Sequence, residues 1–315
     1  MLLFPILIFN LKNVYLTIDN EVQKIADSIL IKNSKFYKFS AILVSDIEKG
    51  RIIAMSCYEG SKFNYNVCLN EKFPAASLFK IATAVASIEI LKLNPDDEIY
   101  YSGRIYSERP YIWLSSYSER KQSFKLAFGL SNNPAFGRLA ILVGSYNLYI
   151  YGKKLFFDVL FPQNDFSLAL MGAGFVNSKI RPIDALKLMT AISNKGLVKS
   201  ITIIDSISNF YYYRTKIEGR IFEEETFHKL KDLFKETINN GTARAFLRGY
   251  DVGGKTGSLY DRIHDGYIKW FVGFFPADEP KYAFVSMIVE KGYNRKQSPI
   301  ANIKPIINYL SSVIQ

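Results

Sequence analysis

The strongest constraint in this sequence is a helical pattern that is apolar almost all round and yet contains a lysine. Most residues at positions 77–91 are apolar, and Lys80 follows one turn after Ser77. A helix without a polar face has to be surrounded by protein, so the chain must fold into layers that enclose it. The 315-residue chain can build such a core, because 49% of its residues are apolar and only 22% are charged. That composition excludes a disordered, collagenous or coiled-coil protein.

Ser77 and Lys80 fall on one face of this helix, because residues three apart are neighbours on a helix. Burial disfavours the charged form of a lysine and lowers its pKa. A neutral amine beside a hydroxyl can act as the general base for a serine nucleophile. An alternative stays open at this point, in which Ser77 only caps the helix and the Lys80 side chain reaches solvent.

Strand patterns lie towards the two ends of the chain and helical patterns lie between them. The expected strands span residues 41–46, 51–57, 251–259, 268–275 and 282–290. The expected helices span residues 77–91, 124–143 with a break at Pro134, 182–194, 223–239 and 300–314. We therefore expect an α/β protein of the α+β type, with a five-stranded antiparallel sheet covered by helices and an inserted all-helical lobe.

This pattern predicts an organisation in two interleaved lobes. Residues 41–315 form the main domain, with a sheet lobe at about 41–70 and 245–315 and a helical lobe at about 71–244. Residues 1–40 form an N-terminal segment, whose apolar start at residues 1–9 is interrupted by Pro5 and lacks a basic leader. That start fits the remnant of an export signal or anchor, or a first buried strand.

Three short motifs occur in a fixed order along the chain. S-x-x-K is at residues 77–80, S-x-N at 131–133 and K-T-G at 255–257. Each motif is weak alone, since S-x-x-K recurs at 118–121 and S-x-N at 145–147. The ordered set is typical of penicillin-recognising serine acyltransferases. From about residue 41 onwards, the chain resembles the transpeptidase domain of a penicillin-binding protein, which has a β-lactamase-like fold.

The resemblance extends beyond the three motifs. Segments similar to this family, in the family's order, are residues 45–55, 130–136, 171–174, 181–186, 240–243, 253–258 and 270–276. The resemblance implies that Ser77 attacks the substrate carbonyl while Lys80 takes its proton. It also implies that Ser131 passes a proton to the departing amine, and that the Asn133 amide holds Lys80 and the substrate.

The third motif would bind the substrate's carboxylate. The resemblance implies that Lys255 and Thr256 hold this group, and that the charge of Lys255 further lowers the pKa of Lys80. Gly257 lets the strand lie against the substrate. The backbone N–H groups of Ser77 and Ser258 would form an oxyanion hole.

The function implied is that of a D,D-transpeptidase or D,D-carboxypeptidase acting on D-Ala-D-Ala peptidoglycan stem peptides, with no metal or organic cofactor. β-Lactams would acylate the same serine. Such a protein works outside the cytoplasm of a bacterium, where the membrane and cell-envelope proteins are candidate partners and nucleic acid is not expected. The net charge of +11 suits an anionic wall polymer but does not select one.

Other functions share parts of this pattern. A serine β-lactamase also acylates, but class A members use a Glu after S-x-N, and no Glu occurs between Glu119 and Glu218. A class D-like or atypical β-lactamase and a non-enzymatic β-lactam sensor remain alternatives. Residues 249–256 fit the P-loop pattern, but an apolar strand before them and a helix after them are not expected.

The sequence allows two interpretations for several other residues. Cys57 and Cys68 could form a disulfide in an oxidising compartment or remain free thiols. Neither the cysteines nor the two histidines have a zinc-binding spacing. His264 could contact the substrate or simply belong to a loop. For the tyrosines at 211–213, an exposed strand or packing is favoured over a stacking surface.

Overall fold

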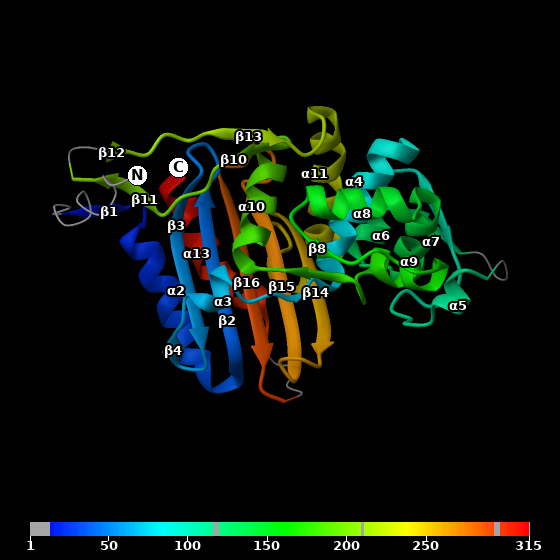
Figure 1. Ribbon diagram of the computed structural model, residues 1–315, viewed down its shortest axis with the longest axis horizontal. Coiled ribbons are helices and arrows are strands. Elements are labelled where there is room, and N and C mark those ends of the chain that lie inside the picture. The colour runs from blue at the N-terminus through cyan, green and yellow to red at the C-terminus, as the bar shows by residue number, and fades with distance from the viewer. Residues whose placement is uncertain (1–12, 116–119, 209–210, 293–296, 315) are drawn as a thin grey trace, which may run out of the picture.

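A six-stranded antiparallel sheet forms the centre of the molecule (Figure 1). The computed structural model describes residues 13–115, 120–208, 211–292 and 297–314. The strands, in spatial order, are β14 (Gly253–Asp261), β15 (Gly266–Phe275), β16 (Tyr282–Glu290), β2 (Tyr37–Asp46), β3 (Arg51–Glu59) and β4 (Lys62–Phe63). The predicted fold class is confirmed, and the two-residue β4 adds a sixth strand to the five expected.

Both faces of this sheet are buried, because its strands alternate between two cores. Along β2, Ala41 and Leu43 join one core, whereas Ile42 and Val44 join the other. The helices that cover the sheet are α2 (Asn20–Asn33), α10 (Pro182–Ser193), α11 (Glu224–Asn239) and α13 (Pro299–Ile314). Helices α2 and α13 pack on the outer face, and α10 and α11 pack on the face towards the second lobe (Figure 1).

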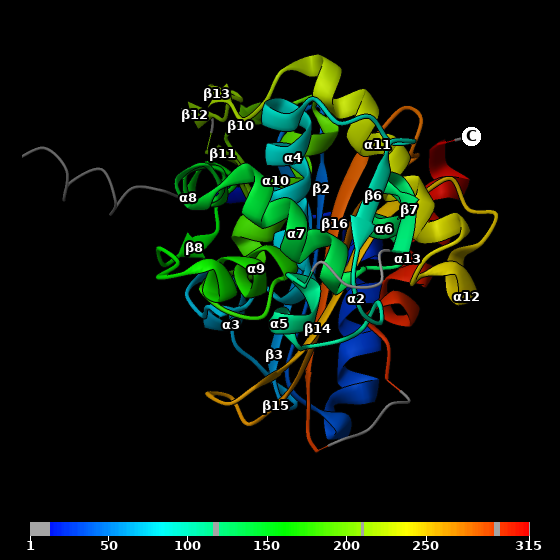
Figure 2. The ribbon, with the colours of Figure 1, turned by 90° about the vertical axis from the view of Figure 1, so that its right-hand side faces the viewer.

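The second lobe is helical and lies beside β14 (Figure 2). Its helices are α4 (Lys80–Leu91), α5 (Pro110–Trp113), α6 (Phe124–Gly129), α7 (Asn133–Val143), α8 (Ser145–Lys154) and α9 (Asp165–Ala173). Helix α4 contacts α7, α8, α9 and α11, and its residues from Lys80 to Ile88 are all buried. The enclosure that the apolar pattern predicts for this helix is therefore observed.

Short helices and four small sheets complete the described structure. The short helices are η1 (Ser34–Phe36), α3 (Asn66–Leu69), η2 (Ala76–Phe79) and α12 (Arg244–Leu247). One small sheet holds β1 (Val14–Leu16), β11 (Ile204–Ile207) and β12 (Tyr211–Tyr212), and another holds β5 (Phe73–Pro74), β9 (Ser178–Ile180) and β8 (Asp158–Val159). Two-stranded sheets pair β6 (Glu98–Tyr101) with β7 (Arg120–Ser123), and β10 (Leu197–Lys199) with β13 (Ile217–Arg220).

Two sequence predictions fall on residues outside this description. They are the apolar start at residues 1–9, and Ser118 with Glu119 of the second S-x-x-K copy. Among the described residues, no helix has both the length and the apolar character needed to cross a bilayer. Tyr211 and Tyr212 form the edge strand β12, in agreement with the strand interpretation.

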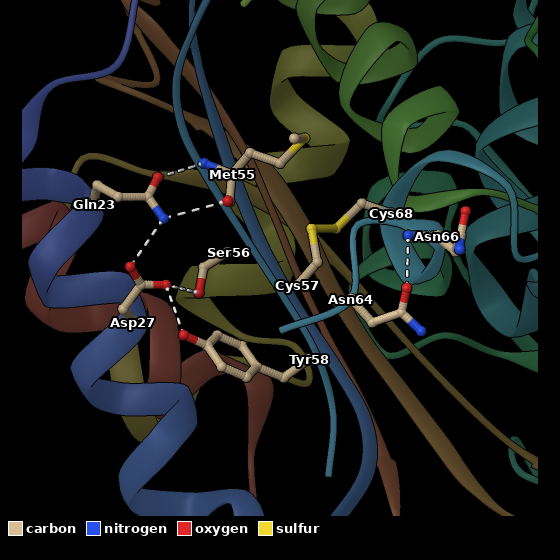
Figure 3. Close-up of a disulfide and its surroundings, with 9 residues drawn as sticks. All are labelled: Gln23, Asp27, Met55, Ser56, Cys57, Tyr58, Asn64, Asn66 and Cys68. Atoms are coloured by element: carbon tan, nitrogen blue, oxygen red, sulfur yellow. Dashed lines mark hydrogen bonds between the residues drawn. A yellow bond between two sulfur atoms is a disulfide. The ribbon is translucent and has the colours of Figure 1, made fainter. Parts of the chain in front are cut away.

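Cys57 and Cys68 are joined by a disulfide (Figure 3). Cys57 lies on β3 and Cys68 on α3, and their Cα atoms are 5.9 Å apart. On the other side of β3, Asp27 of α2 accepts hydrogen bonds from Ser56 and Tyr58 (Figure 3). The disulfide therefore fixes α3 to β3, just before the chain continues into β5 and Ser77.

Candidate active site

Ser77 and Lys80 lie where the turn η2 runs into α4. The Lys80 side chain is fully buried, and its Nζ donates a hydrogen bond to Ser77 Oγ over 2.9 Å. Neither η2 nor α4 has a side-chain cap, so the alternative of a capping serine and a solvent-exposed lysine is wrong. The helix begins one turn later than predicted, because Ala76 has a φ of 48° and residues 76–79 form a 3-10 turn.

The Lys80 amine is held by further acceptors. It donates to Asn133 Oδ1 over 2.9 Å and to the carbonyl oxygen of Ala173 over 2.6 Å. Burial lowers the pKa of Lys80 well below its usual value, and the positive charge of Lys255 lowers it further. A lysine whose pKa is lowered in this way has a larger neutral fraction near pH 7, and only the neutral amine can accept a proton from Ser77.

The S-x-N motif forms the turn between α6 and α7. Asn132 caps α7 by accepting a hydrogen bond from Ala135 N over 3.1 Å, and Ser131 has a φ of 57°. This turn directs Asn133 towards Lys80, and Asn133 Nδ2 donates to the carbonyl oxygen of Ser107 over 3.2 Å. The amide is therefore fixed on both sides, so its oxygen can hold the amine.

The K-T-G motif lies within β14, facing the S-x-N turn. Lys255 is fully buried and donates to Ser131 Oγ over 3.1 Å. Burial lowers the pKa of Lys255 to about 7. Thr256 Oγ1 shares a hydrogen bond of 2.5 Å with Thr242 Oγ1, which places two hydroxyls side by side at the cavity wall.

The predicted residues surround one cavity of about 300 Å³. Ser77, Ser131, Asn133, Thr256, Gly257 and Ser258 all line it. The amines of Lys80 and Lys255 lie behind this lining, where they contact Ser77 and Ser131. A Cβ on Gly257 would lie 3.2 Å from Ser77 N, so the glycine lets the strand approach the nucleophile closely. The structure thus brings all eight predicted site residues together.

Sequence reasoning missed several groups at this site. The Ala173 carbonyl holds Lys80, and Gly174 and Thr242 line the cavity. The available signals were the Gly-Ala-Gly run at 172–174 and the segment 240–243, which both belong to the resemblance. In the part of the chain that the structure describes, no group of His, Cys, Asp or Glu is arranged to hold a metal ion.

The competing motifs do not form sites. In the P-loop match, Lys255 and Thr256 lie inside β14, and β15 follows it instead of a helix. The second S-x-N copy opens α8, where Asn147 Nδ2 bonds the Val143 carbonyl.

Gly174 offers a test of how closely the backbone packs behind Ser77. Its φ is +90°, and a Cβ there would lie 1.9 Å from the Ala76 carbonyl oxygen. Gly174→Ala should therefore shift the Ser77 segment, lower the free energy of unfolding by about 3 kcal/mol and slow acylation by about a hundredfold. Thermal unfolding and acylation by a fluorescent penicillin measure the two effects.

Gly249→Ala is the matched control for this substitution. Gly249 has a φ of +86°, but a Cβ at this position would have no neighbouring atom within 4 Å. Gly249→Ala should lower the free energy of unfolding by only about 1–2 kcal/mol, which is the cost of the backbone strain. Its acylation rate should stay close to that of wild type. Equal acylation by the two variants would contradict a close contact between Gly174 and the nucleophile's segment.

Comparisons with known proteins agree with the motifs. Residues 40–308 match the model of the penicillin binding protein transpeptidase domain. Stage V sporulation protein D of Bacillus subtilis is 27% identical over an alignment of 318 positions, and the match covers 84% of this chain and 48% of that protein. A peptidoglycan D,D-transpeptidase FtsI homolog of Mesostigma viride is 22% identical over an alignment of 343 positions, and the match covers 87% of this chain and 56% of that protein. The chain thus spans about half the length of these relatives.

Solved structures share the fold. The crystal structure of PBPA from Mycobacterium tuberculosis superposes with a TM-score of 0.78 at 18% identity, covering 96% of this chain and 82% of that one. The penicillin G acyl-enzyme complex of penicillin-binding protein A from M. tuberculosis has a TM-score of 0.76 at 17% identity, covering 96% and 81%. Because the family model matches residues 40–308, which is most of the chain, this protein belongs to the penicillin binding protein transpeptidase domain family.

Proposed function

We propose that this protein is a penicillin-binding serine D,D-transpeptidase or D,D-carboxypeptidase that acts on D-Ala-D-Ala peptidoglycan stem peptides. The observation that carries the proposal is the buried Lys80 amine, 2.9 Å from the Ser77 hydroxyl at the cavity. Relatives named as peptidoglycan D,D-transpeptidases support the substrate class.

In the first step, Ser77 Oγ attacks the carbonyl of the penultimate D-Ala and Lys80 takes the hydroxyl proton. The developing oxyanion would be held by the N–H groups of Ser77 and Ser258. When the C–N bond breaks, the departing D-Ala amine takes a proton through Ser131, whose hydroxyl contacts Lys255. The product of this half-reaction is an acyl-enzyme on Ser77 and free D-Ala.

Substrate orientation comes from the β14 side of the cavity. The terminal carboxylate is held by the Lys255 cation and the paired hydroxyls of Thr256 and Thr242. Gly257 lets β14 lie close against the Ser77 segment, so a peptide held along this strand would lie next to the nucleophile. In the second half-reaction, an amine of another stem peptide or water attacks the ester, and Lys80 again serves as base.

A β-lactamase is the second candidate, since it shares the acylation step. Its fast deacylation needs a base for water, and the carboxylates after S-x-N are placed elsewhere. Asp158 pairs with Lys72 at 2.9 Å, and neither it nor Asp165 lines the cavity. Glu108 does line the cavity, but it precedes the S-x-N motif in the chain and is exposed. These placements favour a long-lived acyl-enzyme.

The remaining expectations complete the proposal. Residues 41–315 act as the catalytic domain, with a sheet lobe at about 41–70 and 245–315 and a helical lobe at about 71–244, whose helices α10 and α11 also cover the sheet. Residues 1–40 form an N-terminal segment, and its described part contributes α2 to the sheet's cover. The protein works outside the cytoplasm, and the Cys57–Cys68 disulfide supports an oxidising compartment. Other cell-envelope proteins are its expected partners.

Mass spectrometry of the peptide products tests this function. With a pentapeptide donor and an acceptor stem peptide, we expect D-Ala release and a cross-linked product, and Ser77→Ala should yield neither. D-Ala release without transfer would identify a carboxypeptidase. An unchanged donor despite penicillin labelling would favour a sensor, and loss of the penicillin label within minutes would favour a β-lactamase.

A further inference from the structure

His264 lies in the turn between β14 and β15 and bridges two carboxylates. Its Nδ1 contacts Asp261 Oδ2, and its Nε2 lies 2.9 Å from Glu71 Oε1. Asp261 is the last residue of β14, whereas Glu71 lies in the segment that leads from α3 to Ser77. The imidazole therefore joins the far end of the K-T-G strand to the nucleophile's segment. His264 itself does not line the cavity.

This bridge is shielded from solvent. The side chains of His264 and Asp261 are only 8% and 2% exposed. The imidazole ring packs 4.7 Å from the Phe73 ring and 5.2 Å from the Phe39 ring, measured between centroids. Hydrogen bonds in such apolar surroundings are stronger than in water, and a polar group left without a partner there is costly.

The contacts define a protonation state for the bridge. Ionised carboxylates only accept hydrogen bonds, so both ring nitrogens of His264 have to donate. Only the imidazolium has two N–H donors, since a neutral imidazole keeps one nitrogen as an acceptor. Deprotonation would therefore turn one of the two contacts into a repulsion between lone pairs.

The other charged groups at this turn contact its backbone or one another. Lys38 of β2 donates to the carbonyl oxygen of His264 over 3.2 Å and pairs with Asp265 at 3.0 Å. Tyr260 donates to Asp265 Oδ1 over 2.6 Å, and Arg262 is exposed. These contacts hold the turn in either protonation state of His264, so the imidazole adds a connection that depends on its charge.

We propose that Glu71, His264 and Asp261 are positioning residues for acylation, and that the imidazolium ties β14 to the segment carrying Ser77. This inference rests on the acyl-transfer function proposed above. The geometry that it protects is tight, because Gly257 of β14 packs directly against the backbone of Ser77 and Leu78. A small shift of the strand would misplace the carboxylate-binding residues relative to the nucleophile, and small displacements of reacting groups are costly in rate.

Glu71→Ala tests the bridge with little risk to folding, because the Glu71 side chain is 46% exposed. We expect the second-order rate constant for acylation by a fluorescent penicillin to fall about tenfold at about pH 6. We expect this deficit to be smaller at about pH 8.5, because deprotonation of the imidazole would cost the wild type one of the same two contacts. The protonation of Lys80 and Lys255 affects both proteins alike and cancels in the ratio.

Glu71→Gln should restore the connection. Its carbonyl oxygen can accept from the imidazolium at low pH, and its amide can donate to the neutral ring at high pH. The rate constant of Glu71→Gln relative to wild type should therefore rise between about pH 6 and about pH 8.5. A merely structural contact would give ratios that do not change with pH.

Asp158→Ala is the matched control. Asp158 is 53% exposed and forms its ion pair with Lys72, the neighbour of Glu71, instead of with His264. It should acylate within about twofold of wild type at both pH values. The inference is overturned if Glu71→Ala matches wild type at pH 6, if its deficit is the same at both pH values, or if Asp158→Ala shows the same deficit. Loss of labelling in Ser77→Ala alongside any of these results would leave the proposed function standing.

Discussion

Protein with Ser77 replaced by alanine should take up no fluorescent penicillin under conditions in which each wild-type chain becomes acylated. Ser77 lines the cavity and its Oγ accepts a hydrogen bond from Lys80, so the substitution deletes the atom that would form the ester in the proposed mechanism. Loss of a catalytic serine slows acyl transfer by about a thousandfold or more. Denaturing gel electrophoresis after labelling, with intact-protein mass spectrometry, measures the acyl group directly.

The fold should survive this substitution. Lys80 keeps two acceptors, Asn133 Oδ1 and the Ala173 carbonyl, so no buried donor is stranded. The matched control is Ser118→Ala, which removes the serine of the second S-x-x-K copy and should label like wild type. Labelling of Ser77→Ala at the wild-type level would refute Ser77 as the nucleophile.

The sequence predicted which residues of this site would lie together, because they belong to short motifs. Ser77 and Lys80 are one helical turn apart, so their contact follows from local geometry. The contact between Lys255 and Ser131 joins residues that are distant in the chain, and only the family resemblance could bring them together. The Ala173 carbonyl was missed because a backbone oxygen leaves no mark in residue identity.

The fold was predictable where apolar residues form long patterns. The five long strands and the helices α10, α11 and α13 lie within a few residues of their expected bounds. Helix α2 received no prediction, although Asp19 caps it and Val22, Ala26 and Leu30 are buried on one face. The disulfide stayed undecided because the 5.9 Å between its Cα atoms depends on how α3 packs against β3.

The bridge at His264 shows a different limit of prediction from sequence. A histidine near two aspartates was visible in the sequence, but Glu71 is far from it along the chain. The two partners meet only because β14 and the Ser77 segment pack together. Contacts of this kind depend on tertiary packing, which neither spacing nor periodicity encodes.

Replacing Lys80 by methionine should slow acylation by about a thousandfold, because it removes the general base and keeps an apolar chain of similar length. Lys80→Arg should be as slow, since a guanidinium retains the charge but cannot accept the proton. The two variants separate base catalysis from simple electrostatic stabilisation. If Lys80 acted only through its charge, Lys80→Arg would retain most of the acylation rate. Rates are measured from the time course of fluorescent penicillin labelling.

The dependence of the acylation rate on pH tests the role of Lys80 as general base independently. The pKa of Lys80 is lowered by burial, so acidification protonates the amine and acylation should fall as the pH drops through that lowered pKa. Lys255 has a pKa of about 7, so its cation is lost as the pH rises above that value and carboxylate binding should weaken. The profile of acylation efficiency should therefore have a rising limb and a falling limb. Lys255→Arg stays charged and should abolish only the falling limb, whereas a falling limb that survives in Lys255→Arg would assign it to another group.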